Sequence, residues 1–268
     1  MKQFISLIIH RTFLGHSLNT LLRATFVCFL LLLLPAHTDC ATAAEFSIGI
    51  GGSASSTPYK DYGVQWMPLP LVSLESDYAY IRGYTVGVKL LNLEFLKFSV
   101  FGGYDGMNFK ASDSSDRRLQ ALDNRHSSAV AGMETRLLTP YGMLHANAAR
   151  DILSNSKGWN GTIGYAYSVE LEELEIIATA GLHWANGNYH NYYYGISNKE
   201  AQKSGLHAYK AGAGFSPYLG LTLDYSLNDA WEIFCSGTVN FLNSKIKNSP
   251  MVDKHRTWNI AVGIMYNF

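Results

Sequence analysis

The sequence predicts an all-β protein, an antiparallel transmembrane β-barrel of about 10–12 strands. Three observations lead to this fold class. Apolar and polar residues alternate with a period of two over most of the chain after residue 44. The alternating segments run for about 11–14 residues, whereas an ordinary strand has about 5–6. Their connections alternate between short and long, as in barrels whose two ends face different compartments.

The composition already excludes two classes of protein. The 268 residues carry 21 Lys and Arg against 21 Asp and Glu, and 13% are aromatic, so the chain is not a disordered one. No basic surplus is available to neutralise phosphates, so no nucleic-acid partner is expected. Charged residues make up only 16% of the chain, well below the share of about 25% typical of soluble domains.

The N-terminus has the features of a secretory signal peptide. Lys2, Arg11 and Arg23 precede an apolar run at residues 24–34, and Ala41–Ala44 provides small residues for cleavage. The run is about half of the ~20 residues that a transmembrane helix needs. Residues 1–44 are therefore predicted to be a cleaved signal peptide, and residues 45–268 a single barrel domain.

The last segment shows the alternation most clearly. The apolar face consists of Trp258, Ile260, Val262, Ile264, Tyr266 and Phe268. This face indicates a strand with one wholly apolar side. The terminal Phe268 and the nearby Tyr266 resemble the C-terminal signal that outer-membrane barrels present to the barrel assembly machinery, so this machinery is an expected partner.

Similar alternation recurs upstream, clearly at 159–169 and 215–225 and more weakly at 78–90. A soluble sandwich would alternate too. The barrel is favoured because aromatic residues gather at strand ends, as interface girdles require. These residues are Trp159, Trp184, Tyr225, Trp231, Trp258 and Tyr266.

The connections predict the orientation, because short turns of such barrels are periplasmic and long loops extracellular. The short turns are expected at 90–94, 139–142, 171–174 and 226–229, and the long loops at 109–125, 151–157, 189–212 and 244–255. Ten strands follow from about Gly63, and residues 45–54 look like an eleventh. Bacterial single-chain barrels have even strand numbers. The segment 45–54 therefore pairs with an unrecognised strand, or lies elsewhere, for example in the lumen or periplasm. Pro68 and Pro70 weaken the strand near them.

No catalytic motif stands out, and we expect no enzyme, no cofactor and no metal. The nine histidines are scattered, without HExxH or Cys/His spacing. Aspartates and histidines in the outer loops allow a rim cluster like that of outer-membrane proteases, but loop charges are usually only solvated.

Two groups of residues are candidates for functional roles. Glu134, Arg136, Asp224 and Glu232 fall on the luminal face of their strands, where they form either paired charges that fill a narrow barrel or the lining of a channel. The loop at 189–212 carries Tyr189, Tyr192, Tyr193 and Tyr194, followed by a short helix at 198–204. These tyrosines either contact an extracellular partner or pack across the barrel mouth.

Several segments resemble the MipA/OmpV family of outer-membrane proteins. The longest is residues 191–234, which contain YYYGIS, EAQKSGL and FSPYLGLTLDYSLNDAWEIF; shorter ones are MPLPLVS (67–73), RLQALDNR (118–125), LSNSKGW (153–159) and NSPMVDK (248–254). They occur in the family's order and span nearly the whole chain after residue 44. Ala121 stands where the family often has glycine.

The resemblance implies an outer-membrane barrel in a Gram-negative bacterium that interacts with a lytic transglycosylase and scaffolds it with a peptidoglycan synthase. Segment 45–62 would be an extra surface for such partners if it stays periplasmic. The alternatives are a narrow porin-like channel and a surface adhesin or receptor that acts through loop 189–212. Outer-membrane lipid and lipopolysaccharide are the expected surroundings.

Overall fold

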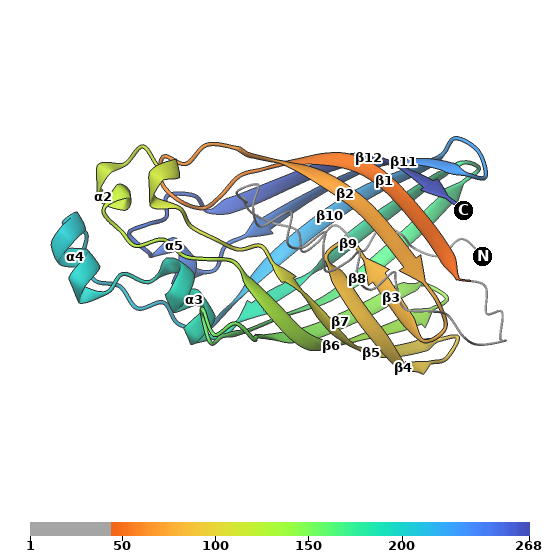
Figure 1. Ribbon diagram of the computed structural model, residues 1–268, viewed down its shortest axis with the longest axis horizontal. Coiled ribbons are helices and arrows are strands. Elements are labelled where there is room, and N and C mark those ends of the chain that lie inside the picture. Colours follow the sequence, from red (N-terminus) through yellow and green to blue (C-terminus); the bar gives the residue numbers. More distant parts are fainter. Residues whose placement is uncertain (1–43) are drawn as a thin grey trace, which may run out of the picture.

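The computed structural model describes residues 44–268, which form a closed barrel of twelve antiparallel strands (Figure 1). The predicted signal peptide lies, except for Ala44, outside the described residues. The strands are β1 (Glu45–Ser55), β2 (Gln65–Glu75), β3 (Ala79–Arg82), β4 (Thr85–Asn92), β5 (Leu96–Asp105), β6 (Ser128–Thr139), β7 (Gly142–Asp151), β8 (Trp159–Leu171), β9 (Leu174–Ala185), β10 (Gly214–Ser226), β11 (Trp231–Phe241) and β12 (Arg256–Asn267). The predicted fold class is confirmed, at the upper end of the expected strand number.

The first strand closes the barrel. β1 pairs along its length with β12 on one side and with β2 on the other. Of the two alternatives for residues 45–54, a place in the lumen or the periplasm is therefore wrong, and a wall strand made even in number by an unrecognised strand is correct. An edge strand would expose unpaired N–H and C=O groups to lipid, and pairing β1 with β12 removes that cost.

The unrecognised strand lies in the segment 78–90, which the alternation presented as one strand. It is a hairpin of β3 and β4, joined by the two residues Gly83 and Tyr84. Gly83 has a φ of 54°, a conformation that glycine adopts without strain. The side-chain parity changes across the turn, so Ile81 and Val86 face each other in the register although one number is odd and the other even.

The outward faces form the apolar belt that lipid requires. Exposed side chains along it include Ile50, Ile163, Leu219 and Val262. Trp231 and Tyr266 contact each other at the inner end, with ring centroids 5.1 Å apart. Trp258 and Trp159 are exposed toward the outer end. These aromatic residues mark the depth of the membrane on the strands that carry them.

The two ends of the barrel differ. The start of β1, the C-terminus and the short turns lie at one end, and the long loops lie at the other (Figure 1). The long loops carry the short helices η2 (Ala111–Asp113), α2 (Arg117–Gln120), α3 (Gly187–Tyr194), α4 (Asn198–Ser204) and α5 (Ser244–Lys247). Within residues 44–268, no helix is long and apolar enough to cross a membrane. By the rule for such barrels, the short turns are periplasmic and the long loops extracellular.

Candidate functional site

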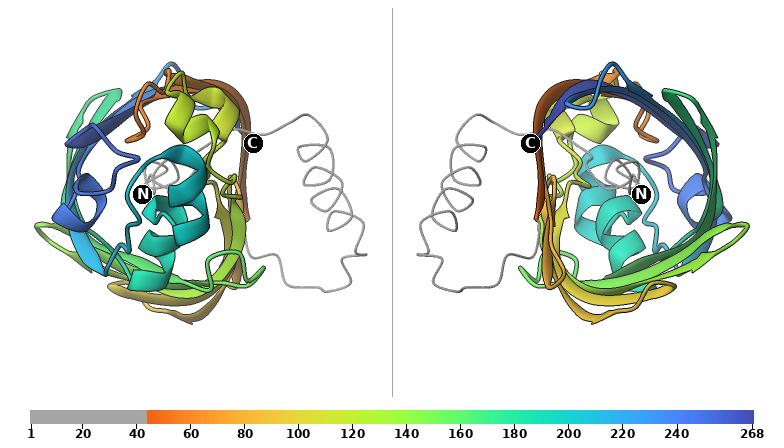
Figure 2. Two further views of the ribbon diagram at one scale, coloured as in Figure 1. Left: turned by 90° about the vertical axis from the view of Figure 1, so that its left-hand side faces the viewer. Right: turned by 90° about the vertical axis from the view of Figure 1, so that its right-hand side faces the viewer.

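The extracellular loops form a compact cap over the barrel mouth, which we define as residues 56–64, 106–127, 186–213 and 242–255. Seen along the barrel axis, α3 and α4 lie within the outline of the barrel (Figure 2). One apolar cluster holds the four loops together, and its buried members include Tyr59, Phe109, Leu119, Tyr193 and Met251. Because every loop contributes to this cluster, the cap is a small hydrophobic core of its own.

A buried ion pair links two of the loops. Arg125 Nη2 lies 2.6 Å from Glu200 Oε1, and both side chains are at most 9% exposed. The guanidinium also donates to the carbonyl oxygens of Tyr192 and Asp123. Burial raises the pKa of Glu200, but hydrogen bonds from Ser197 and Arg125 outweigh it and hold the pKa below its usual value. Glu200 is therefore a carboxylate that accepts from two parts of the cap.

Local sequence explains the two helices nearest the mouth. The side chain of Asn186 accepts from the Tyr189 N–H and begins α3. Ser197 and Glu200 form a capping box at the start of α4, and Gly205, with a φ of 71°, ends it. The short helix expected at 198–204 is confirmed as α4.

The four tyrosines of the candidate contact loop lie on or beside α3. Tyr193 is 0% exposed, Tyr194 is buried, and Tyr189 and Tyr192 are partly buried against the same cluster. The Tyr193 hydroxyl donates to the His126 carbonyl, and the Tyr192 hydroxyl accepts from the His126 N–H. The rings thus tie α3 into the cap, and contact with an extracellular partner stays a prediction.

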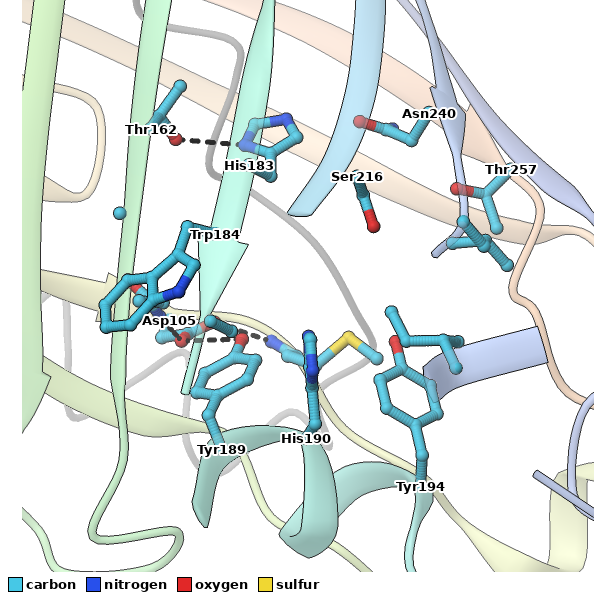
Figure 3. Close-up of a pocket in the computed structure, with 16 residues that line it drawn as sticks. Asp105, Thr162, His183, Trp184, Tyr189, His190, Tyr194, Ser216, Asn240 and Thr257 are labelled. Atoms are coloured by element: carbon cyan, nitrogen blue, oxygen red, sulfur yellow. Dashed lines mark hydrogen bonds between the residues drawn. The ribbon is translucent and has the colours of Figure 1, made fainter. Parts of the chain in front are cut away.

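Below α3 the lumen contains a cavity of about 260 Å³ (Figure 3). Its polar lining comes from the cap and from six strands. The lining includes Asp105, Asn160, Thr162, His183, His190, Ser216, Asn240 and Thr257. A cavity of this size and polarity has room for several water molecules or a small polar solute.

Hydrogen bonds inside the barrel already occupy several of these groups. Asp105 accepts from the Asn160 amide at 2.9 Å and from the Tyr189 hydroxyl at 3.0 Å, so it fastens the cap to β5 and β8. His183 Nδ1 lies 2.9 Å from the Thr162 hydroxyl, and its ring stacks on Tyr218. These hydrogen bonds rigidify the cavity wall.

His190 connects the cavity to the underside of the cap. Its Nδ1 lies 2.8 Å from the Gly212 carbonyl oxygen and donates to it. Burial lowers the pKa of His190 below its ordinary value, and the hydrogen bond to Gly212 offsets only part of that effect. His190 is therefore neutral at neutral pH.

The periplasmic half of the lumen carries a network of ion pairs on one wall and a group of acids on the other. On the β2–β6 wall, Arg82 lies 2.9 Å from Glu75 and 3.2 Å from Glu134. Arg136 is 3.4 Å from Glu134, and Lys89 is 2.5 Å from Glu75. Two of the predicted luminal charges, Glu134 and Arg136, thus belong to one ion-pair network.

The other two predicted luminal charges lie across the barrel. Asp224 of β10 is buried and stands opposite Glu175 of β9 in the register, and Glu232 of β11 follows beyond the turn. The β9–β11 wall is therefore acidic. Among the described residues, no group of three or more His, Cys, Asp or Glu side chains has the geometry to hold a metal ion.

The predicted assembly signal lies at the periplasmic end. The ring of Phe268 is 4.8 Å from Tyr266 and 5.2 Å from Phe46, and Phe268 is exposed. The sequence did not single out Arg125 and Glu200, which are separated by 75 positions. The Ser197-x-x-Glu200 capping pattern was the only local signal near them.

Comparisons with known proteins find a matching family model and several similar proteins. The family model of the MltA-interacting protein MipA matches residues 48–268. The MltA-interacting protein of Escherichia coli K12 is 35% identical over 233 residues, which cover 87% of this chain and 92% of that protein. The putative outer membrane protein YiaT of the same organism is 32% identical, with 85% and 93% covered. A solved structure of the NanC porin covers 82% of this chain and 100% of its own, with 8% identity and a TM-score of 0.42.

Proposed function

The chain belongs to the MltA-interacting protein MipA family and is a β-barrel of the Gram-negative outer membrane, and from this premise we propose that it is a non-enzymatic scaffold for cell-wall remodelling. In this role it links a lytic transglycosylase with a peptidoglycan synthase at the periplasmic face. The observation that best supports this proposal is the 35% identity, over nearly the full length of both chains, to a protein named for interaction with MltA.

The shape of the barrel supports a role at the periplasmic face. The cap lies across the outer mouth and is held together by an apolar cluster, whereas the periplasmic rim consists of short turns. Every charged residue in these turns is an exposed acid: Asp77, Glu94, Glu172, Glu173 and Asp229. Such a rim attracts a partner with a basic surface and steers its approach.

An affinity pull-down tests the scaffold. The tagged barrel is recovered from gently solubilised envelopes, and its partners are identified by mass spectrometry against an unrelated barrel. We expect specific recovery of a lytic transglycosylase or a peptidoglycan synthase. The double variant Glu172→Lys, Glu173→Lys should reduce that recovery, because it reverses the charge of one turn.

The matched control reverses two exposed charges at the other end of the barrel. Lys199→Glu with Lys210→Glu changes the cap surface and should leave recovery unchanged. Recovery of the barrel with lipid alone would contradict the scaffold. Equal loss in both double variants would show that the periplasmic rim is not the contact surface.

A narrow channel is the second candidate, favoured by the charged lumen. Basic side chains on the β3–β6 wall face the acids Glu175, Asp224 and Glu232 across the barrel, which produces a field across any path for solutes. Conductance in planar bilayers that changes its ion selectivity in Asp224→Asn would support this function. A barrel that does not conduct would exclude it.

Assembly and surroundings belong to the same proposal. We propose that Tyr266 and Phe268 are read by the barrel assembly machinery, and that lipid and lipopolysaccharide surround the apolar belt. Deleting Phe268 should lower the amount of barrel in the outer membrane, measured by heat-modifiable migration in gels. Unchanged amounts would contradict a role for the terminal ring.

A further inference from the structure

One strand has an edge without a neighbour. β2 pairs with β3 only at Ser73, Leu74 and Glu75. The Gly83 N–H donates to the Val72 carbonyl oxygen at 2.9 Å, and that is where the hairpin ends. In the described part of the chain, no strand pairs with residues 65–71 on this side, and Figure 1 shows β2 continuing alone past the tip of β3. We call this side of residues 65–71 the open edge.

The two prolines of β2 belong to the open edge. Alternate residues of a strand point their N–H and C=O groups to the same side, and the Val72 carbonyl points to β3. Pro68 and Pro70 have the same parity as Val72, so their missing N–H groups would have pointed to the open edge. Proline therefore costs no ladder bond here, and it removes two donors that would otherwise lack a partner.

The open edge lies at the depth of the membrane. In the register, Pro70 stands opposite Ile50, which stands opposite Ile264; Pro68 is linked in the same way through Gly52 to Val262. On β12 these residues lie between Trp258 and Tyr266. The medium outside the open edge is therefore lipid hydrocarbon.

The inner face behind the open edge is apolar. Met67, Leu69 and Leu71 point inward from β2, and Leu69 and Leu71 pack with Phe234, Ala261 and Met265. The inward residues of β10, and Ser236 of β11 next to Phe234 on the same face, are instead polar; those of β10 include Ser216, Thr222 and Asp224. The apolar part of the lumen wall thus begins at the open edge.

These observations together indicate which kind of molecule binds at the open edge. We propose that the open edge admits an acyl chain of an outer-membrane lipid from the bilayer into the apolar cluster of Met67, Leu69, Leu71 and Phe234, whose packed side chains move apart to receive it. A strand of another protein is a poor occupant, because Pro68 and Pro70 cannot donate to it. A hydrocarbon chain needs no hydrogen bonds and gains from apolar contact.

Photo-crosslinking in intact cells tests this site. A benzophenone side chain is placed at Leu69, which faces the lumen beside the open edge, in the full-length protein. The matched control is Thr222, which also faces the lumen but lies on a strand paired on both sides. Trp66, which is 80% exposed, is the outward control that must contact lipid. Adducts are identified by gel shift and by mass spectrometry for lipid A and phospholipid.

We expect lipid adducts at Leu69 and Trp66 and none at Thr222. Adducts at Trp66 alone would overturn the proposal, as would lipid adducts at both inward positions, since lipid would then enter by another route. A protein adduct at Leu69 would also overturn it. If the Leu69 variant fails to fold, the benzophenone is placed at the half-buried Met67 instead. In that protein, the double variant Leu69→Ser, Leu71→Ser should abolish the lipid adduct at Met67.

Discussion

The two walls of the barrel differ in how completely they are paired. β8, β9 and β10 have 13, 12 and 13 residues and carry polar side chains inward, and β9 pairs along its whole length with both of its neighbours. β3 has 4 residues and leaves most of β2 with one neighbour only. The long wall carries the acids Glu175 and Asp224, whereas the short wall is apolar inside where its pairing stops.

The prolines follow this difference. Pro68 and Pro70 lie on the open edge. Pro217 immediately precedes Tyr218, which is the first residue of β10 that pairs with β11. All three occupy positions where one neighbouring strand is missing. The comparison teaches that a proline within an alternating run marks where the barrel wall has lost a strand neighbour.

The largest expected effect comes from a proline in the long wall. Ala178 of β9 faces outward and stands opposite Tyr167 on one side and Leu221 on the other. Ala178→Pro removes a ladder donor where lipid offers no substitute, so the barrel should fail to assemble. The measurement is heat-modifiable migration of outer-membrane fractions. A normally assembled Ala178→Pro barrel would contradict the conclusion that proline is tolerated only where a neighbouring strand is missing.

The next effect separates the cap from the barrel beneath it. Arg125→Ala leaves the buried Glu200 carboxylate without its partner, which costs about 3–5 kcal/mol of cap stability. We expect proteases added to whole cells to cleave within residues 186–213 while the barrel stays heat-modifiable. The control is Lys203→Ala, whose exposed pair with Asp123 spans 3.8 Å and should contribute little. Equal cleavage in both variants would contradict the assigned role of the ion pair.

Acidification should loosen the cap before it affects the barrel. Because burial lowers the pKa of His190 in the folded state, the folded cap binds the proton less readily than the unfolded loop does. Its stability is complete above the ordinary histidine pKa of about 6.5 and falls as the pH drops below that value. Glu200, whose folded pKa is lowered, loses its contribution only at lower pH, below about 4.3.

Protease sensitivity of the cap, measured from pH 7.5 to 5, checks this order. His190→Asn removes the titrating group, so its sensitivity should not change over the same range. A wild-type cap that is equally resistant throughout would show that His190 is protonated without cost.

The smallest effect is expected at the open edge itself. Pro70→Ala restores an N–H that has no strand to bond and increases the freedom of the unfolded chain, so stability should change by less than about 1 kcal/mol. Urea titration of the purified barrel measures the difference. A loss as severe as that of Ala178→Pro would show that Pro70 has a structural role beyond pairing.

Much of the wall could be predicted from alternation alone. Segments such as 159–169 and 215–225 were identified because a strand with a neighbouring strand on each side has one face toward lipid and the other toward the lumen. Its apolar and polar residues therefore alternate. The β3–β4 hairpin was missed because a two-residue turn interrupts the alternation only by changing its parity. Closure by β1 was undecided, since Ser47 pairs with Asn267, 220 positions away.

The candidate site was predictable only in part. Parity placed Glu134, Arg136, Asp224 and Glu232 inside, because side-chain direction in a strand is a local property. The ion-pair partners were not predictable, since Arg82 reaches Glu134 across two intervening strands. The tyrosines of α3 were recognised as a group, but their burial depends on loops that come together only in the folded cap.

The sequence by itself determined that the barrel lies in a membrane, which side chains of a strand face lipid and which face the lumen, and the family. These properties depend on residue type at fixed local spacing. Tertiary structure alone decided which loops close the mouth, that basic and acidic walls face each other, and that Pro68 and Pro70 border lipid on an open edge. These features depend on contacts between distant segments, whose positions are set only when the last strand pairs with the first.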